Sequence, residues 1–300
     1  MSRKQSTLWN FLFLNVGFLL SIVNGILIIP LYLHYMNSGI YGAWLATGNI
    51  LTWITMVDPG VSGVLLQKVS SATGRNDKTE IGLAITSGIF ISLSLFAVAL
   101  ALGIGFSFFV VDIARIDKIY SNDILSAFRI AVWGSVFYLI SHTFSSIILA
   151  FQKAKYVGII NNAVTLLQII VTVTLLVRGY GIYSLAVAAL IRGVFIFVSM
   201  AAVALYILRQ NHIKFNYQLS YLKSFSKIFT YTFGSRLFDV IASNIDLILV
   251  SRYLGSSSVT ILDLCRRPLK ILTGLSNNIT ISMLPSLAHL YGSKDEVRLR

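Results

Sequence analysis

The sequence has 300 residues, of which 56% are hydrophobic and 12% are charged, about half the charged fraction of an ordinary soluble domain. Apolar runs recur from end to end, which excludes a soluble domain of any size. The formal net charge of +13 would suggest a nucleic-acid partner in a soluble protein, but loop topology is the first explanation in a membrane protein.

Eight apolar segments are long enough to cross about 30 Å of hydrocarbon, and the lack of water there requires helices. We predict them at approximately 8–33, 41–66, 81–111, 124–151, 157–177, 182–208, 229–253 and 259–291. The basic, then apolar, N-terminus lacks a small-residue cleavage site, so it is predicted to be a retained first span and not a signal peptide.

The connecting segments alternate in charge. Fourteen Lys and Arg residues fall on one predicted side and four on the other, which places both termini in the cytoplasm. This asymmetry explains most of the basic charge, so no nucleic-acid partner is expected. The single cysteine and four scattered histidines suggest no metal site, and without a phosphate-binding loop motif we expect neither a cofactor nor ATP hydrolysis.

Ten charges remain inside the predicted spans. They are Arg129, Arg192, Arg236, Arg266, Arg267, Lys270, Asp58, Asp239, Asp246 and Asp263. A cation exposed to lipid at mid-bilayer costs about 2.5–3.5 kcal/mol on insertion scales, so such residues usually face a polar interior.

The charges of the last two spans form stripes. At 3.6 residues per turn, Asp263, Arg266, Arg267 and Lys270 share an arc of roughly 100°. Asp263 and Arg267 are four residues apart and can pair, which leaves the other two cations without a partner on their own helix. Arg236, Asp239 and Asp246 share one face of the seventh span in the same way. Two such stripes are consistent with one water-filled cavity.

A weak internal repeat relates the two ends of the chain. An offset of 218 residues brings Tyr35 onto Tyr253 and Ser38 onto Ser256, so that the first two spans correspond to the last two. Transporters are often built from such repeats. We therefore predict a six-helix lobe at residues 1–210, a basic cytoplasmic linker at 211–228 and the first two helices of a second lobe at 229–300.

Several stretches carry a family resemblance: "IIPLYLHYM", "YGAW", "DPG" and "VSSATGRND", followed by "IDLILVSRYLGSSSV" and "ISMLPSLAHLYGSKDE". Together they resemble the bacterial polysaccharide and O-antigen flippases of the multidrug/oligosaccharidyl-lipid/polysaccharide exporter superfamily. The family typically has twelve or more helices, so the resemblance predicts that the second lobe is incomplete, in a fragment or a truncated reading frame.

The resemblance implies an all-α polytopic protein of the bacterial inner membrane. Its expected function is to flip a lipid-linked oligosaccharide, such as an O-antigen repeat unit destined for lipopolysaccharide, by alternating access without covalent chemistry. Membrane lipids and the polysaccharide polymerase machinery are the further partners that it implies.

The intraspan cations Arg266, Arg267, Lys270, Arg192 and Arg236 are our candidates for binding the phosphate or pyrophosphate of such a substrate, because arginine offers a fixed fork of donors. The alternatives are interhelical salt bridges or snorkelling to the surface. The acids Asp58, Asp239, Asp246 and Asp263 are candidates for ion coupling or charge balance, although Asp58 can also cap a helix break at Pro59 and Gly60. Polar residues including Asn161, Asn162 and Gln168 can contact sugar or pack helices.

Two other functions are alternatives to a flippase. A cation-coupled drug or metabolite exporter would favour acidic cavities, whereas six intraspan cations against four acids favour an anion. A membrane-embedded glycosyltransferase or polymerase would need carboxylates or histidines at a water-filled site, often on a large outer loop. The predicted outer loops are short and offer no catalytic pair, so an enzyme is not expected.

Overall fold

The computed structural model describes residues 12–13, 15–20, 22–23, 28–56, 60–114, 116, 118–223, 245–269 and 272–273, and its regular structure within these residues is helical, with no strand. The helices are α2 (Ile29–Tyr35), α3 (Ser38–Met56), α4 (Val61–Gly74), α5 (Lys78–Ser107), α6 (Val110–Ala114), α7 (Lys118–Ala150), α8 (Ala154–Val177) and α9 (Tyr183–Gln210). Residues 15–20, 219–223, 245–254 and 256–269 are also helical.

Local chemistry explains several helix boundaries. α2 carries proline in its first turn, where the missing N–H is not needed. The side chain of Asn37 accepts a hydrogen bond from the N–H of Ile40 at 2.8 Å, which caps the start of α3. Asp77 caps α5 in the same way through the N–H of Glu80.

The second predicted span is two helices, α3 and α4. The break includes Gly60, whose φ of +94° is a left-handed conformation that glycine adopts without steric cost. Asp58 and Pro59 lie outside the described residues, so the predicted role of Asp58 stays a prediction.

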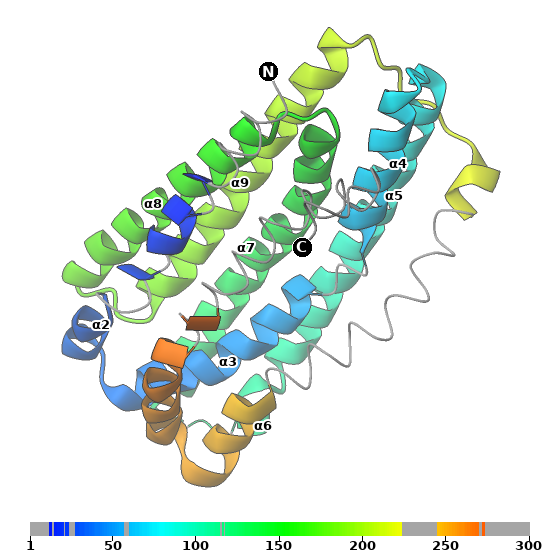
Figure 1. Ribbon diagram of the computed structural model, residues 1–300. Coiled ribbons are helices and arrows are strands. Elements are labelled where there is room, and N and C mark those ends of the chain that lie inside the picture. Colours follow the sequence, from blue (N-terminus) through cyan, green and yellow to red (C-terminus); the bar gives the residue numbers. More distant parts are fainter. Residues whose placement is uncertain are drawn as a thin grey trace, which may run out of the picture.

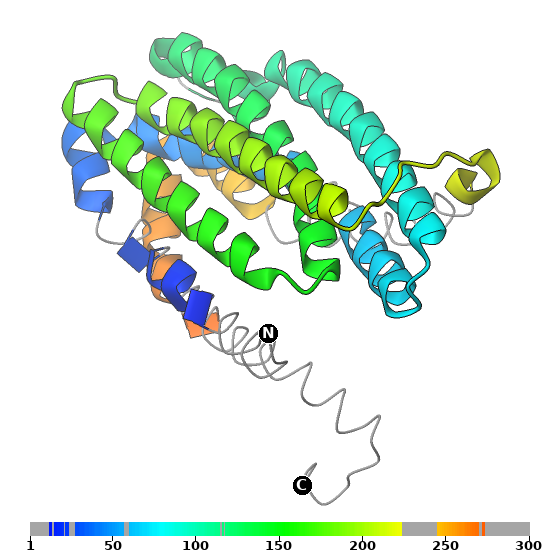
Figure 2. The same cartoon turned by 90° about the horizontal axis from the view of Figure 1, so that it is seen from above.

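α7 is the central helix of the bundle (Figure 1), where it packs against α3, α4, α5 and α9. Its most apolar 18-residue window is 56% buried, against 17% for α5 and for α8. α8 packs along α9 on one flank, and Figure 2 shows the two helices running side by side. Among the described residues, α5, α7, α8 and α9 are each long and apolar enough to cross a membrane.

The bundle has two ends. One carries α6, the start of α3 and the turn at Gly255, and we call it the α6 end (Figure 1). The other carries the α4–α5 turn, the α7–α8 turn and the end of α9, where Arg75, Lys153 and Arg209 lie. We call it the basic end.

Two hydrophobic cores fill the bundle. The first lies toward the α6 end and joins α3, α6 and the first half of α7 to residues 245–259. The second lies toward the basic end and joins α4, α5 and the last turns of α7 and α9. Along α9, the last buried residue of the first core is Ala186 and the first buried residue of the second core is Ile196. The interval between them contains Arg192.

Residues 245–254 and 256–269 form a helical pair joined at Gly255, which we call the 245–269 hairpin. Its break matches that of the first two spans, since Ser256 begins a helix and corresponds to Ser38, the first residue of α3, in the repeat.

Candidate functional site

A tight helix crossing positions the central part of α9. A Cβ atom on Gly193 would lie 2.0 Å from the carbonyl oxygen of Gly134 on α7, and one on Gly134 would lie 2.5 Å from that of Ala189. Helix backbones approach this closely only where small residues meet. The crossing therefore holds the neighbouring Arg192 at a fixed depth beside α7.

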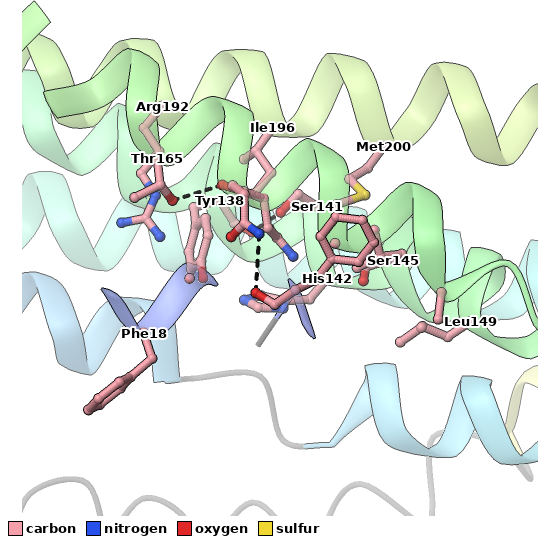
Figure 3. Close-up of a pocket in the computed structure, with 17 residues that line it drawn as sticks. Phe18, Tyr138, Ser141, His142, Ser145, Leu149, Thr165, Arg192, Ile196 and Met200 are labelled. Carbon is pink, nitrogen blue, oxygen red and sulfur yellow. Dashed lines mark hydrogen bonds between the residues drawn. The ribbon is translucent and has the colours of Figure 1, made fainter. Parts of the chain in front are cut away.

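A cavity of about 540 Å³ extends from this crossing toward the basic end (Figure 3). It is lined by Tyr138, Ser141, His142, Ser145 and Leu149 of α7, Ala154, Val157, Gly158, Asn161, Asn162 and Thr165 of α8, Arg192, Ile196 and Met200 of α9, and Phe13, Gly17 and Phe18 of the first span. Its volume is ordinary for a small-molecule site. Hydroxyl and amide groups supply much of the lining, and no carboxylate is among these residues.

Arg192 is the cation of this cavity. Its guanidinium lies over the ring of Tyr138, 4.9 Å from the centroid, a distance at which the ring's negative face attracts the cation. Its Nε is buried and has no hydrogen-bond partner among the described residues. Because a buried N–H without a partner costs free energy, the described protein groups leave this guanidinium incompletely satisfied.

Arg192 and Tyr138 also line a second cavity of about 200 Å³, together with Leu51, Ser135 and Gln168. The two side chains therefore stand between a larger cavity that reaches the basic end and a smaller one beside α3. Of the polar residues predicted to contact sugar or pack helices, Asn161 and Asn162 line the larger cavity and Gln168 lines the smaller.

The first span closes one wall of the larger cavity. The side-chain amide of Asn162 donates to the carbonyl of Phe13 at 3.1 Å, and a Cβ on Gly158 would lie 2.5 Å from the ring of Phe13. Asn162 thus makes a helix-packing hydrogen bond, one of its two predicted roles. Asn161 is exposed on the same wall.

The other predicted cations lie elsewhere. Arg267 pairs with Asp263 on its own helix at 2.7 Å, which confirms the pairing expected from their spacing, and it donates to the hydroxyl of Tyr41 at 2.7 Å. Arg266 forms an ion pair with Asp246 of the neighbouring helix. Arg236, Asp239 and Lys270 lie outside the described residues, so their roles stay predictions.

Arg129 stands apart from both groups. It donates from Nε to the hydroxyl of Ser107 at 3.3 Å, and its guanidinium lies 5.6 Å from the ring centroid of Phe108. These contacts fix it near the α6 end of α7. Within the described part of the chain, no group of three or more His, Cys, Asp or Glu side chains is arranged to hold a metal ion.

Sequence reasoning missed the α7 wall of the cavity. Tyr138, Ser141, His142 and Ser145 follow one another at intervals of three, one and three residues, so they lie on one face of the helix. That polar stripe inside an apolar span could have identified the cavity wall. The prediction instead concentrated on the charged residues of the last two spans.

Comparison with known proteins supplies the family. The family model described as "Polysaccharide biosynthesis protein" matches residues 38–300. No curated protein matches the sequence significantly. Among solved structures, the chain is similar to one described as "Inward-facing conformation of a multidrug resistance MATE family transporter of the MOP superfamily", with a TM-score of 0.68 and 14% identity over 95% of this chain and 68% of that one.

The structural likeness shows the fold, and the family match covers most of the chain. Both agree with the resemblance noted in the sequence and with an all-α polytopic architecture. The chain is a multi-pass membrane protein that belongs to the polysaccharide biosynthesis protein family and has the fold of a MOP-superfamily transporter.

Proposed function

We propose that this protein flips a lipid-linked oligosaccharide across the bacterial inner membrane, and that Arg192 binds the phosphate or pyrophosphate of its headgroup. The lipid tail stays in the bilayer while the headgroup passes through the polar interior. The basic end faces the cytoplasm in this proposal, as the loop charges predict. No covalent step is involved.

The observation that carries the proposal is the setting of Arg192. It lies in the third turn of α9, about 13 Å from the start of the helix at 1.5 Å per residue, which is too deep to reach a membrane surface easily. It lies at the wall of a cavity with one buried N–H that lacks a protein partner in the described structure. Arg192 as a whole is half-buried, and an anionic group that reaches its guanidinium would accept hydrogen bonds from it strongly because both partners are charged.

The rest of the lining suits a glycan. Ser145 and Asn161 offer neutral donors and acceptors to sugar hydroxyls, and Tyr138 and Phe18 offer aromatic faces. Aromatic and neutral polar groups can hold an uncharged sugar ring without demanding a counter-charge. The alternative, a cation-coupled exporter of the same superfamily, is favoured less because the described lining of this cavity contains a cation and no carboxylate.

The remaining predicted cations differ in how well they suit a role in cargo binding. Arg266 and Arg267 already have carboxylate partners, so an anionic cargo would have to compete with these partners. Lys270 and Arg236 remain candidates on sequence grounds alone.

The test replaces Arg192 in the intact protein, in cells whose surface glycan depends on it. A hydrogen bond to a charged group contributes about 1.5–3 kcal/mol. Arg192→Gln is therefore expected to reduce glycan display by roughly 10- to 100-fold when cargo is limiting. Glycan display by Arg192→Lys should lie between that of the parent and that of Arg192→Gln, because lysine keeps the charge and lacks the planar fork.

The matched control is Arg178→Gln, which removes an exposed guanidinium beyond the end of α8, outside the cavity. Its display should equal that of the parent. Protein abundance in the membrane is measured for every variant. Full display with Arg192→Gln at normal abundance would overturn the role given to Arg192.

A further inference from the structure

We propose that residues 211–223, which follow α9 at the basic end, form a binding surface for anionic lipid headgroups at the edge of the bilayer. We call these residues the 211–223 segment. It carries exposed apolar side chains beside lysines. The contact requires only that the protein spans a membrane, so it does not depend on which cargo the protein carries.

The 211–223 segment is attached to the bundle at a fixed depth. A Cβ on Gly82 would lie 2.1 Å from the carbonyl oxygen of Lys214, so the backbone of the segment rests directly on α5. Gly82 lies in the second turn of α5, about 6 Å from the start of the helix. The charged first turn includes Glu80, and the apolar sequence begins at Ile81. The segment therefore crosses α5 where this helix, which is long enough to span a membrane, changes from polar to apolar. That boundary is the level of the lipid headgroups.

Further contacts hold the two ends of the segment against the first lobe. Ile213 and Tyr221 pack against the second hydrophobic core. The Nζ of Lys68 on α4 lies 5.4 Å from the centroid of the Tyr221 ring, within the range of a cation–π interaction. Figure 1 and Figure 2 both show the segment, in yellow, running from the end of α9 toward the end of the bundle that carries the α4–α5 turn. Packing on α4 and α5 thus fixes its course.

The side chains that the segment exposes are large and apolar. The exposed fractions of Phe215, Tyr217 and Leu219 are 55%, 61% and 53%. Three such side chains close together in the sequence indicate an interaction surface, whereas single exposed apolar residues do not. Aromatic side chains with a polar end favour the boundary between membrane and water. Because the segment crosses α5 at that boundary, lipid is the partner that fits these side chains.

The charge of the segment selects anionic lipid. It contains Lys214 and Lys223 and no aspartate or glutamate. The acids at the start of α5 have other contacts, since Glu80 forms an ion pair with Arg75 and Asp77 caps the helix. Each lysine near an anionic membrane surface strengthens the attraction, by roughly fivefold in affinity. Apolar side chains flanked by cations are the pattern of chain segments that lie in the plane of such a surface.

The experiment measures which lipid touches the segment. The intact protein with Cys265→Ser and Tyr217→Cys carries a fluorophore on the new cysteine and is reconstituted in phosphatidylcholine vesicles. Phosphatidylglycerol or phosphatidylcholine brominated near the headgroup then replaces part of the lipid, because bromine quenches fluorescence only on contact. We expect both lipids to quench, with half-maximal quenching at a mole fraction roughly fivefold lower for phosphatidylglycerol. No quenching by either lipid would overturn the proposal, and so would equal mole fractions for the two.

Two variants separate the charge from the apolar side chains. Lys214→Gln should raise the mole fraction of phosphatidylglycerol needed by roughly fivefold and leave quenching by phosphatidylcholine unchanged. Phe215→Ser should weaken quenching by both lipids, because it removes apolar area from the contact. The matched control is Arg178→Gln, beyond the end of α8, which should change neither. Equal values for Lys214→Gln and Arg178→Gln would refute the selection by charge.

A second position tests whether the contact is local. Gly74→Cys places the fluorophore at the end of α4, where nothing lies within 4 Å of an added Cβ. Quenching there should be weak and the same for both lipids. Preferential quenching by phosphatidylglycerol at both positions would mean that anionic lipid surrounds the whole basic end, and would overturn a surface built by the segment.

Inorganic phosphate distinguishes a lipid surface from a site for a free anion. It carries the charge of a headgroup without the acyl chains, so millimolar phosphate should leave quenching by phosphatidylglycerol unchanged. Relief of quenching by phosphate would assign the contact to a free anion and refute the lipid surface. No cargo is present in these measurements, so the lipid surface and the role of Arg192 are tested separately.

Discussion

The crossing of α7 and α9 makes a sharp prediction about stability. Gly193→Ala would place a Cβ atom 2.0 Å from the carbonyl oxygen of Gly134 and 2.8 Å from its Cα. Ordinary contact begins near 3.4 Å, so the two helices must separate by more than 1 Å at this point. Neither atom can rotate away, because both belong to the backbone. Overpacking of this kind typically costs about 1–3 kcal/mol.

The assay is the thermal stability of the purified protein in detergent, with Gly105→Ala as the control. Gly105 lies in α5 with nothing within 4 Å of an added Cβ, so alanine there should hold or raise stability through its better helix propensity. Gly193→Ala should lower the apparent melting temperature by several degrees and weaken glycan display. Equal melting temperatures for the two variants would refute the close crossing.

Two further predictions concern charges in the described helices. Asp263→Asn leaves the cation of Arg267 without its carboxylate, in a pair whose acidic side chain is 7% exposed. It should therefore lower the expression level and the melting temperature strongly. Adding Arg267→Gln should recover part of that loss, and no recovery would contradict the pairing. Asp77→Ala removes the cap of α5 and should cost about 1 kcal/mol, seen as a small fall in melting temperature with display retained; an unchanged melting temperature would show that the cap contributes little.

The sequence predicted α5, α7, α8 and α9 closely, because hydrocarbon thickness dictates their length and apolar composition; it did not predict the break between α3 and α4. It also predicted the pair of Asp263 and Arg267, since both lie on one helix and spacing alone brings them together. The sequence assigned no partner to Arg266. Its partner, Asp246, lies on the adjacent helix, and spacing within one helix says nothing about which face a neighbour presents.

The cavity was harder to predict for the same reason. Arg192 stood out as a charge deep inside a span, but the α7 residues beside it are uncharged and individually ordinary. They become a site because Gly134 and Gly193 bring the two backbones together, and a glycine in a span does not reveal which helix it meets. The periodicity of a helical sequence predicts which residues share one face of that helix. Which two helix faces pack together depends on the three-dimensional structure.

The pair of Arg266 and Asp246 offers the clearest way to separate structural from cargo-binding cations. Both side chains are about one-third exposed. Arg266→Asp alone puts two carboxylates together and should reduce display, and Asp246→Arg alone puts two guanidinium groups together with the same result. The exchanged double variant restores the attraction with the charges reversed, so we expect it to recover most of the display. Failure of the exchange at normal abundance would mean that a cation is needed at position 266 itself, as an anion-binding role for Arg266 requires.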